Sequence, residues 1–207
     1  IQYLGCNAIW LIPCFDSPFV VAGYVVRDYY KVAPRYGTNE VLKHLFEEAH
    51  ERGMHVILDL VPGHTSSECK WFKESCKAER NAYTDRYVWS DSIWNAPTGI
   101  GRITGWLRGG YDRDGSAAVN FFTAQPALNY GFYEKDEGQS WQQDIHDEGP
   151  VSTRKELLKI MKFWLSLGCD GFRVDMAGSL VKNDPNNIGI ISLWQEIFSA
   201  LRPEYPE

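Results

Sequence analysis

The chain contains the stretch Gly168-Cys169-Asp170-Gly171-Phe172-Arg173-Val174-Asp175-Met176-Ala177-Gly178. An amphipathic segment that predicts a helix comes directly before it, and residues 171–174 are predicted to form a short buried strand. Residues two apart on a strand point to the same face, so Arg173 and Asp175 are expected to lie side by side at the strand's end. Two interpretations are open here: a structural ion pair, or a carboxylate that its arginine keeps ionised for nucleophilic attack.

Two further segments predict strands. Residues 8–12 form a continuous apolar run closed by Pro13 and are predicted to be a buried strand. Residues 54–61 are predicted to form the second strand, which ends at Asp59-Leu60-Val61 before Pro62. Residues 13–37, rich in Pro, Gly and Tyr, are expected to form a loop.

Three amphipathic segments predict helices between and after the strands. Thr38 caps the first, which runs to about Arg52 and stops at Gly53; Thr153 and Glu156 form a capping box for the second, which Gly168 stops. A third helix is predicted over residues 188–201. The faces expected to be buried comprise Val41, Leu42, Leu45, Phe46 and Ala49 in the first helix, and Leu157, Leu158, Ile160, Met161, Trp164 and Leu165 in the second.

Strands that alternate with helices predict an α/β fold with a parallel sheet, which both a doubly wound sheet and an α/β barrel satisfy. The position of the polar residues favours the barrel. Tyr24 and Asp28 follow the first strand, His64 follows the second and Asp175 ends the third. Barrel enzymes build their active sites at this carboxyl-terminal face of the strands.

The regular pattern is interrupted between Thr65 and Pro150. This stretch has short groups of Trp, Tyr, Gly, Asn and Asp without a sustained period, and it is too long for an ordinary loop. We predict an inserted subdomain of irregular and short β structure. The chain is thereby divided into a barrel part over residues 1–64, the insertion over 65–150 and a continued barrel part over 151–207.

Composition limits the possible partners. The net charge is −6 and no dense Lys/Arg run occurs, which argues against a nucleic-acid partner. No run of eighteen apolar residues is present, so no membrane span is predicted. Aromatic residues make up 14% of the chain, which suits both a packed core and a sugar-binding surface, where ring faces stack on pyranoses.

The five cysteines match no zinc pattern, and we expect reduced, buried thiols, with a Cys69–Cys76 disulfide as the alternative. The chain begins at Ile1 without a recognisable signal peptide, and both ends are expected to be cuts through a larger domain. The compartment is left open, with a preference for the cytoplasm.

Four motifs in order resemble the α-amylase superfamily, glycoside hydrolase family thirteen. Asp59-Leu-Val-Pro-Gly-His64 resembles its D-x-V-x-N-H motif, and Gly171-Phe-Arg-Val-Asp175 matches its G-F-R-x-D motif. Gly23-Tyr24 with Asp28-Tyr29 resembles the G-Y-x-x-x-D-Y loop, and residues 125–130 resemble the Q-P-D-L-N segment of domain B. The resemblance covers essentially the whole chain and favours the nucleophile over the structural ion pair.

The resemblance implies a barrel of eight strand–helix units with domain B inserted after the third strand. The three predicted strands then correspond to the second, third and fourth, so the chain resembles the N-terminal half of the barrel. Three strands cannot close a barrel, and open sheet edges are expected.

The resemblance also implies roles for five residues. Asp175 attacks the anomeric carbon and Arg173 holds that carboxylate ionised and aimed. His64 hydrogen-bonds the sugar in the cleavage subsite, Tyr24 stacks under the same sugar, and Asp59 orients neighbouring groups, Arg173 among them.

Retaining hydrolysis needs a second carboxyl group about 5 Å from the first as general acid. In the family this Glu ends the next strand. Glu196 falls inside the last predicted helix, and Glu204 and Glu207 lie among prolines. The general acid is therefore expected beyond residue 207.

Some positions depart from the family. Gly63 replaces an Asn that ligates a structural calcium in many members, so no cofactor is expected and calcium is doubtful. Val25 and Ala127 replace aspartates, and Gly178-Ser179 stand where a Lys-His pair is common. Residues 112–116 are expected to form a surface turn, with a calcium loop as the alternative.

The resemblance predicts a retaining enzyme that hydrolyses α-glucans or α-glucosides such as starch or maltodextrin. Two alternatives stay open: a transglycosylase of the same family, and a non-catalytic sugar-binding relative.

Overall fold

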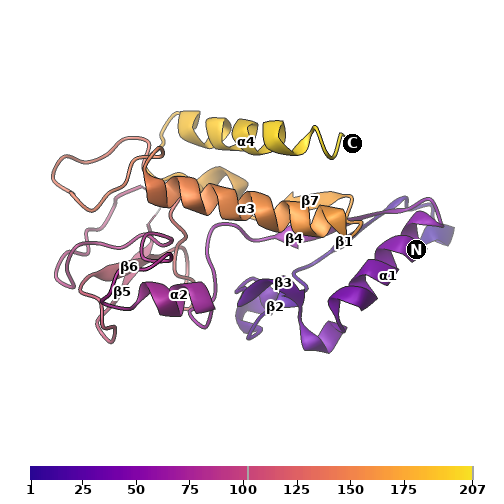
Figure 1. Ribbon diagram of the computed structural model, residues 1–207, viewed down its shortest axis with the longest axis horizontal. Helices are drawn as coiled ribbons and strands as arrows, with labels where there is room; N and C mark the ends of the chain where they lie inside the picture. Colours follow the sequence, from indigo (N-terminus) through magenta and orange to yellow (C-terminus); the bar gives the residue numbers. More distant parts are fainter. Residues whose placement is uncertain (102, 207) are drawn as a thin grey trace.

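The computed structural model describes residues 1–101 and 103–206 and has a three-stranded parallel sheet at its centre (Figure 1). The strand order is β1-β4-β7, comprising β1 (Ala8–Leu11), β4 (His55–Leu60) and β7 (Gly171–Val174). All three coincide with the predicted strands, and their parallel pairing confirms the predicted α/β class.

Three long helices accompany the sheet: α1 (Asn39–His50), α3 (Glu148–Ser166) and α4 (Ile188–Leu201). The side chain of Thr38 accepts a hydrogen bond from the backbone N–H of Val41, which confirms the predicted cap of α1. Figure 1 shows α4 running alongside α3, while α1 lies near the N-terminus. The bounds of α4 are those predicted.

The predicted capping box of α3 is wrong. The helix begins at Glu148, and Asp147 is its N-cap residue. The Thr153 hydroxyl instead donates to the carbonyl of Gly149, 3.0 Å away and one turn back. Apolar periodicity starts later than the helix because the first turn packs against the polar insertion, so the pattern could not locate its true start.

The burial expected for the strands at residues 8–12 and 171–174 is wrong, because β1 is partly exposed and β7 only half-buried, whereas the middle strand β4 is mostly buried. Val56, Leu58 and Leu60 of β4 are fully buried. In β1, however, Trp10 is 49% exposed, and the following Ile12 is 58% exposed. The strands β1 and β7 each have a neighbour on one side only, so their side chains lack half of the covering that β4 receives.

One half of the predicted apolar face of α1 is also exposed. Phe46 and its neighbours on the inner side are buried, but Val41 is 55% and Leu45 is 38% exposed. These two side chains face an open apolar groove of about 370 Å³ beside β1, whose lining includes Leu11 and Ile12. On α3, Leu157, Ile160, Met161 and Trp164 are buried as predicted, while Leu158 and Leu165 are only half-buried.

The segment predicted as a loop before Gly37 contains a small antiparallel sheet, β2 (Phe15–Asp16) with β3 (Asp28–Val32). It packs against α3 through Trp164, which is fully buried. The Trp164 ring stacks on Phe15 with centroids 5.1 Å apart, and its Nε1 donates to the carbonyl of Tyr29 at 2.8 Å. These contacts join residues that are far apart in the sequence.

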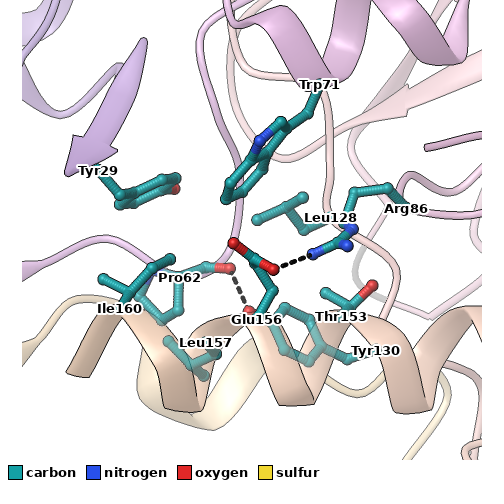
Figure 2. A pocket seen from close by; sticks show the side chains of 10 residues that line it. All are labelled: Tyr29, Pro62, Trp71, Arg86, Leu128, Tyr130, Thr153, Glu156, Leu157 and Ile160. Carbon is teal, nitrogen blue, oxygen red and sulfur yellow. Dashed lines mark hydrogen bonds and ion pairs between the residues drawn. The ribbon is translucent and has the colours of Figure 1, made fainter. Parts of the chain in front are cut away.

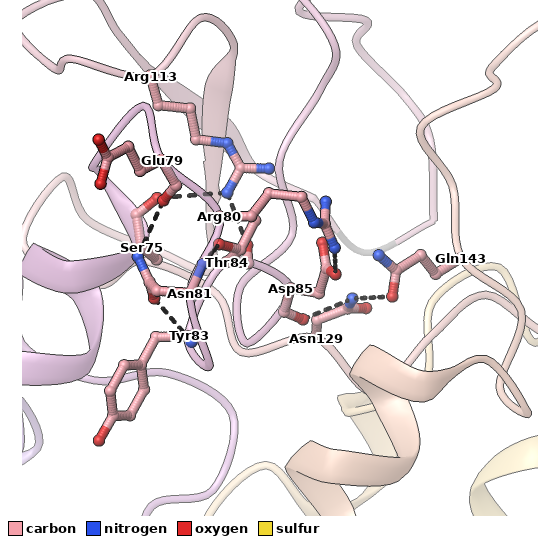
Figure 3. A network of polar contacts seen from close by, with 10 residues as sticks. All are labelled: Ser75, Glu79, Arg80, Asn81, Tyr83, Thr84, Asp85, Arg113, Asn129 and Gln143. Atoms are coloured by element: carbon pink, nitrogen blue, oxygen red, sulfur yellow. Dashed lines mark hydrogen bonds and ion pairs between the residues drawn. The ribbon is translucent and has the colours of Figure 1, made fainter.

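Residues 65–147, between β4 and α3, contain short elements joined by isolated bridges and are here called the inserted lobe: α2 (Lys70–Ser75), β5 (Gly105–Arg108) and β6 (Ser116–Val119). Side chains tie its loops together (Figure 3). Arg113 donates to the carbonyl of Thr84 at 2.6 Å, and Arg80 pairs with Asp85. Short 3-10 helices elsewhere comprise Gln2–Leu4, Val20–Gly23, Pro34–Tyr36 and Ala177–Ser179.

In the turn over residues 112–116, the carboxylate of Asp114 is bonded to the protein's own backbone. Asp114 accepts hydrogen bonds from the backbone N–H groups of Ile93 and Gly115, at 3.1 and 2.9 Å. Among the described residues, no three His, Cys, Asp or Glu side chains are grouped to hold a metal.

All five cysteines are free thiols, of which Cys6 is exposed and Cys76 half-buried, so the alternative Cys69–Cys76 disulfide is wrong. None of the helices described in residues 1–101 and 103–206 has the length and apolar character needed to cross a membrane.

Candidate active site

The register of the sheet brings the polar residues of two strands together. Asp59 of β4 pairs with Arg173 of β7, and the backbone N–H of Asp175 donates to the carbonyl of Leu60 at 2.8 Å. Parallel strands end at the same edge of a sheet, so side chains more than a hundred residues apart become neighbours. This edge is the carboxyl-terminal one, as the sequence predicts.

Arg173 lies between two carboxylates. Its Nη1 is 2.9 Å from Oδ1 of Asp175 and 3.1 Å from each carboxylate oxygen of Asp59. The side chain of Asp59 is completely buried, whereas that of Asp175 is 18% exposed. The carboxylate of Asp175 is therefore accessible to solvent, whereas that of Asp59 is closed to solvent and accepts hydrogen bonds from Arg173 and Tyr24.

Burial and charge act in opposite directions on this pair. Burial raises the pKa of Asp59, although the hydrogen bonds from Arg173 and Tyr24 partly counteract it. Burial also works against the charge of Arg173, but the hydrogen bonds and charge of Asp59, with the charge of Asp175, raise the pKa of the guanidinium overall. Arg173 is thus a permanent cation at the site.

Tyr24 joins the cluster from a strained loop. Val21 and Ala22, just before it, have φ values of 56° and 52°, a left-handed backbone that a β-branched residue rarely adopts. The Tyr24 hydroxyl donates to Oδ2 of Asp59 at 3.0 Å. Burial, followed by this hydrogen bond, raises the pKa of Tyr24, so the hydroxyl keeps its proton.

Trp10 is a member of the site that the sequence analysis missed. The Arg173 guanidinium carbon lies 5.3 Å from the Trp10 ring centroid and 5.9 Å from that of Tyr24. Both distances are within the range of cation–π attraction. The sequence feature that could have indicated Trp10 is a large aromatic side chain within the short strand predicted over residues 8–12.

His64 is fixed by two hydrogen bonds that define its tautomer. Its Nε2 lies 2.8 Å from the carbonyl of Tyr24 and must donate, so Nδ1 accepts from Nδ2 of Asn120 at 3.3 Å. Burial lowers the pKa of His64 to about 4; the Tyr24 carbonyl and Asp175 act in the opposite direction, and the charge of Lys182 adds to the effect of burial. The ring is therefore neutral near pH 7.

Behind His64 lies a buried polar chain that the motifs did not reveal. Asn120 donates through Nδ2 to the carbonyl of Gly63 at 2.7 Å and accepts from Nζ of Lys182 at 3.1 Å. Asn120 and Lys182 are 6% and 2% exposed. A lysine and an asparagine without a motif carry no sequence signal for such a contact.

This arrangement does not suit a calcium ion beside His64. A Cβ atom on Gly63 would lie 3.0 Å from Nδ2 of Asn120, so that amide occupies the space of any longer side chain. Gly63 supplies no side-chain oxygen, and the Lys182 ammonium places a positive charge in the same buried region. A calcium ion would meet an ammonium there instead of carboxylates.

Two exposed residues next to His64 and Asp175 were not singled out by the sequence analysis. Phe121 is 49% exposed and presents its ring edge-on to His64, with centroids 6.5 Å apart. Met176, directly after Asp175, is 41% exposed and has a φ of 53°. Unfavourable backbone conformations of this kind persist where the surrounding structure imposes them, commonly at functional sites.

Of the glutamates considered as internal general acids, Glu207 lies outside the described residues and the other two are engaged elsewhere. Glu196 of α4 accepts from Nε of Arg154 at 2.9 Å, and Glu204 pairs with Lys162 of α3. The first pair joins α4 to α3, and the second joins the turn after α4 to α3.

The parallel strands, with the polar cluster at their carboxyl-terminal edge, correspond to part of an α/β barrel. The family model described as "Alpha amylase, catalytic domain" matches residues 1–190. The chain therefore belongs to the α-amylase family, glycoside hydrolase family thirteen. The resemblance stated from the four motifs is confirmed.

Proteins that are similar in sequence and in structure support the same family. The chain is 37% identical to an oligo-1,6-glucosidase of Heyndrickxia coagulans over 184 residues, which cover 88% of this chain and 30% of the relative. It is 34% identical to the trehalose synthase/amylase TreS of Mycolicibacterium smegmatis, over 90% of this chain and 29% of the relative. The crystal structure of Bacillus licheniformis trehalose-6-phosphate hydrolase superposes with a TM-score of 0.80 at 29% identity, over 99% of this chain and 37% of that one. The chain thus spans about a third of the length of the proteins that it matches, and its fold is the corresponding part of their barrel.

Proposed function

We propose that this chain forms part of the catalytic domain of a retaining enzyme that acts on α-glucans or α-glucosides, with Asp175 as the nucleophile. The observation that carries the proposal is the ion pair of 2.9 Å between Arg173 and Asp175 at the end of β7. A partly exposed carboxylate with a fixed cationic partner suits nucleophilic attack on an anomeric carbon. The relatives named above include glucosidases and hydrolases of α-linked sugars, which supports this substrate class.

The proposed reaction has two displacements. In the first, a carboxylate oxygen of Asp175 bonds to the anomeric carbon while the bond to the leaving oxygen breaks, and a general acid gives that oxygen its proton. In the second, an acceptor attacks the anomeric carbon, the ester bond breaks and the acceptor's proton passes to the same acid–base group. Arg173 keeps Asp175 aimed throughout, and Asp59 holds Arg173.

The remaining residues would bind the sugar. In neutral His64, Nε2 already donates to the carbonyl of Tyr24. A sugar hydroxyl that accepts a hydrogen bond from Nε2 would therefore have to replace this carbonyl. The ring of Tyr24 offers an apolar surface beside Arg173, which suits stacking under a pyranose. The general acid is proposed to lie outside this chain, since Glu196 and Glu204 pair with arginine and lysine on the outer helices.

A transglycosylase is the second candidate, because relatives include a trehalose synthase/amylase. Both reactions share the glycosyl-enzyme and differ only in whether water or a sugar attacks it. Product analysis with maltose separates them: free glucose indicates hydrolysis, and a new disaccharide indicates transfer. A non-catalytic relative would lack the nucleophile, whereas Asp175 and its arginine are both in place.

The test of the proposal is to trap the intermediate in the complete enzyme that carries this chain. An α-glucosyl fluoride with a ring fluorine slows the second displacement, so a covalent adduct accumulates. Mass spectrometry of peptides should find one hexosyl adduct on Asp175. An adduct on another carboxylate, or none with an enzyme that still turns over the substrate, would overturn the assignment.

A further inference from the structure

Asn120, directly after β6, joins His64 to a buried cation. Its Nδ2 lies 2.7 Å from the carbonyl of Gly63 and 3.3 Å from Nδ1 of His64, and its Oδ1 lies 3.1 Å from Nζ of Lys182. These residues come from three segments: the loop after β4, the inserted lobe and the segment after β7. His64 is 2% exposed, like Lys182, so bulk water has little access to the hydrogen bonds between them.

Only one orientation of the Asn120 amide suits its neighbours. The carbonyl of Gly63 can only accept, so the amide nitrogen has to face it. The ammonium of Lys182 can only donate, so the amide oxygen has to face that side. An amide turned over would place two acceptors 2.7 Å apart and two donors 3.1 Å apart. Two independent neighbours thus fix the same orientation.

The fixed amide decides where His64 carries its proton. Because Nδ2 of Asn120 presents an N–H to Nδ1, this ring nitrogen has to keep its lone pair. The proton then lies on Nε2, which donates to the carbonyl of Tyr24 at 2.8 Å. A proton on Nδ1 would set two N–H groups against each other, so the contact with Asn120 favours the neutral ring over the imidazolium.

The backbone that carries His64 is held on its other side. The Tyr29 hydroxyl lies 2.7 Å from the carbonyl of Val61 and 2.8 Å from that of His64, and the Tyr130 hydroxyl donates to the carbonyl of Pro62 at 2.9 Å. Figure 2 shows Tyr29, Pro62 and Tyr130 lining one pocket between the lobe and α3. With the backbone fixed, the polar neighbours of the ring decide its protonation.

Charges of opposite sign act on His64 from the segment after β7. The carboxylate of Asp175 favours the imidazolium, whereas burial and the charge of Lys182 disfavour it. From the remaining sides the ring meets Tyr24, whose hydroxyl keeps its proton, and the edge of Phe121. Asp175 is therefore the charge in this set that promotes protonation, and the amide and the ammonium oppose it.

A neutral His64 suits the proposed reaction. Retaining glycosidases pass through an oxocarbenium-like transition state, in which the sugar gains positive charge. An imidazolium beside the sugar would oppose that charge, in a site that already contains the Arg173 cation. A neutral ring with its proton on Nε2 can still donate to a sugar oxygen that replaces the Tyr24 carbonyl.

We propose that Asn120, oriented by Lys182 and the Gly63 carbonyl, is a positioning residue that keeps His64 neutral with its proton on Nε2 during the reaction. The effect on catalysis rests on the proposed function, whereas the proton positions can be tested without any activity.

Neutron diffraction tests the proton positions. Crystals of the complete enzyme, exchanged into heavy water near neutral pH, should show deuterium on Nε2 of His64 and none on Nδ1. Two deuterium atoms should lie on the Asn120 amide nitrogen and three on Nζ of Lys182. Deuterium on Nδ1 of His64, or the amide oxygen of Asn120 facing the ring, would overturn the proposal whatever substrate the enzyme uses.

Asn120→Asp tests the effect on catalysis. The carboxylate still accepts from Lys182, but it accepts from Nδ1 of His64 instead of donating to it, so it favours the imidazolium. The kcat of this variant relative to the unmodified enzyme should fall about tenfold between pH 8 and pH 5, with little change in KM. A loss of equal size at every pH would indicate a merely structural role and would overturn the proposal.

A matched control introduces the same charge elsewhere. Asn186→Asp changes an exposed residue before α4, and its kcat relative to the unmodified enzyme should not vary with pH. If the covalent adduct forms on Asp175 while the ratio for Asn120→Asp stays constant, the proposed function stands and this inference fails. An unmodified enzyme that cleaves no α-glucoside would overturn the proposed function and the catalytic role of Asn120, and the deuterium positions would still decide the protonation of His64.

Discussion

Nη1 of Arg173 lies 2.9 Å from Oδ1 of Asp175, and the same nitrogen lies 3.1 Å from both carboxylate oxygens of Asp59. One nitrogen atom of Arg173 thus contacts both the accessible carboxylate of Asp175 and the buried carboxylate of Asp59. We expect the buried carboxylate of Asp59 to hold the Arg173 guanidinium in place, and the guanidinium to orient the accessible carboxylate of Asp175. The predictions for these residues differ because their exposure differs.

Asp175→Asn in the complete enzyme should remove nearly all turnover and leave the fold intact. An amide cannot form the glycosyl ester, while its oxygen can still accept from Arg173. The measurement is hydrolysis of an α-glucoside with an activated leaving group, which needs little acid assistance and so isolates the nucleophile. Activity within about tenfold of the unmodified enzyme would exclude Asp175, because loss of the covalent route should cost far more.

Asp59→Asn should lower turnover by about a hundredfold through misplacement of Arg173. Asparagine still accepts from Tyr24 but carries no charge for the guanidinium. Stability should fall by about 1–2 kcal/mol, less than for a fully buried pair, because Arg173 is 39% exposed. Asp16→Asn, which breaks the pair with Arg27 in the β2–β3 sheet, is the control. It should affect stability alone, and an equal loss of turnover would show that the effect is not specific to the site.

No tightly bound calcium is expected beside His64. Gly63 offers no side-chain oxygen, and the Lys182 ammonium contacts Asn120 in the same region. Metal analysis after dialysis against a chelator should find no stoichiometric calcium, and restoring calcium should leave the melting temperature unchanged. A stabilisation of several degrees would show that other ligands compensate.

His64 should make stability depend on pH below about 6.5. Its folded pKa of about 4 lies below the ordinary value of 6.5, so the unfolded chain binds a proton that the folded chain refuses between these values. Stability is fully present above pH 6.5 and falls as the pH decreases towards 4, by on the order of 3 kcal/mol.

The pH effect is measured as the difference between the unfolding profiles of the unmodified protein and His64→Gln. That difference should decrease from pH 6.5 to 4 and stay constant above pH 7. His44→Gln, which changes a side chain 69% exposed, should reproduce the unmodified profile. A flat difference for His64→Gln would mean that the imidazole titrates normally in the folded protein.

The 207-residue chain alone should show no turnover of soluble starch above buffer. It carries the proposed nucleophile, but within residues 1–101 and 103–206 we find no carboxyl group placed as general acid. Acid catalysis contributes about a hundred- to ten-thousandfold. Its groove beside β1 and its open strand edges should also make it prone to aggregation. Adding the remaining part of the barrel as a separate chain should restore some activity. Clear turnover by the purified chain would mean that Glu196 or Glu204 leaves its ion pair and reaches the site.

The sequence by itself determined the strands, most helix ends and the edge where the site lies. The strand over residues 171–174 and the helix over 188–201 have the predicted bounds, because local periodicity and turn residues encode them within a few positions. The alternation of strands and helices then placed Asp59, Arg173 and Asp175 at one edge, since parallel strands end together.

Tertiary structure alone decided which apolar residues stay exposed and which distant polar residues meet. Trp10 and Val41 are as apolar as any core residue, yet both are exposed because no neighbouring element covers them. Lys182 reaches Asn120 across 62 positions, and Arg86 faces Glu156 across 70. No local pattern encodes such pairs, because a contact between distant residues depends on how whole elements pack.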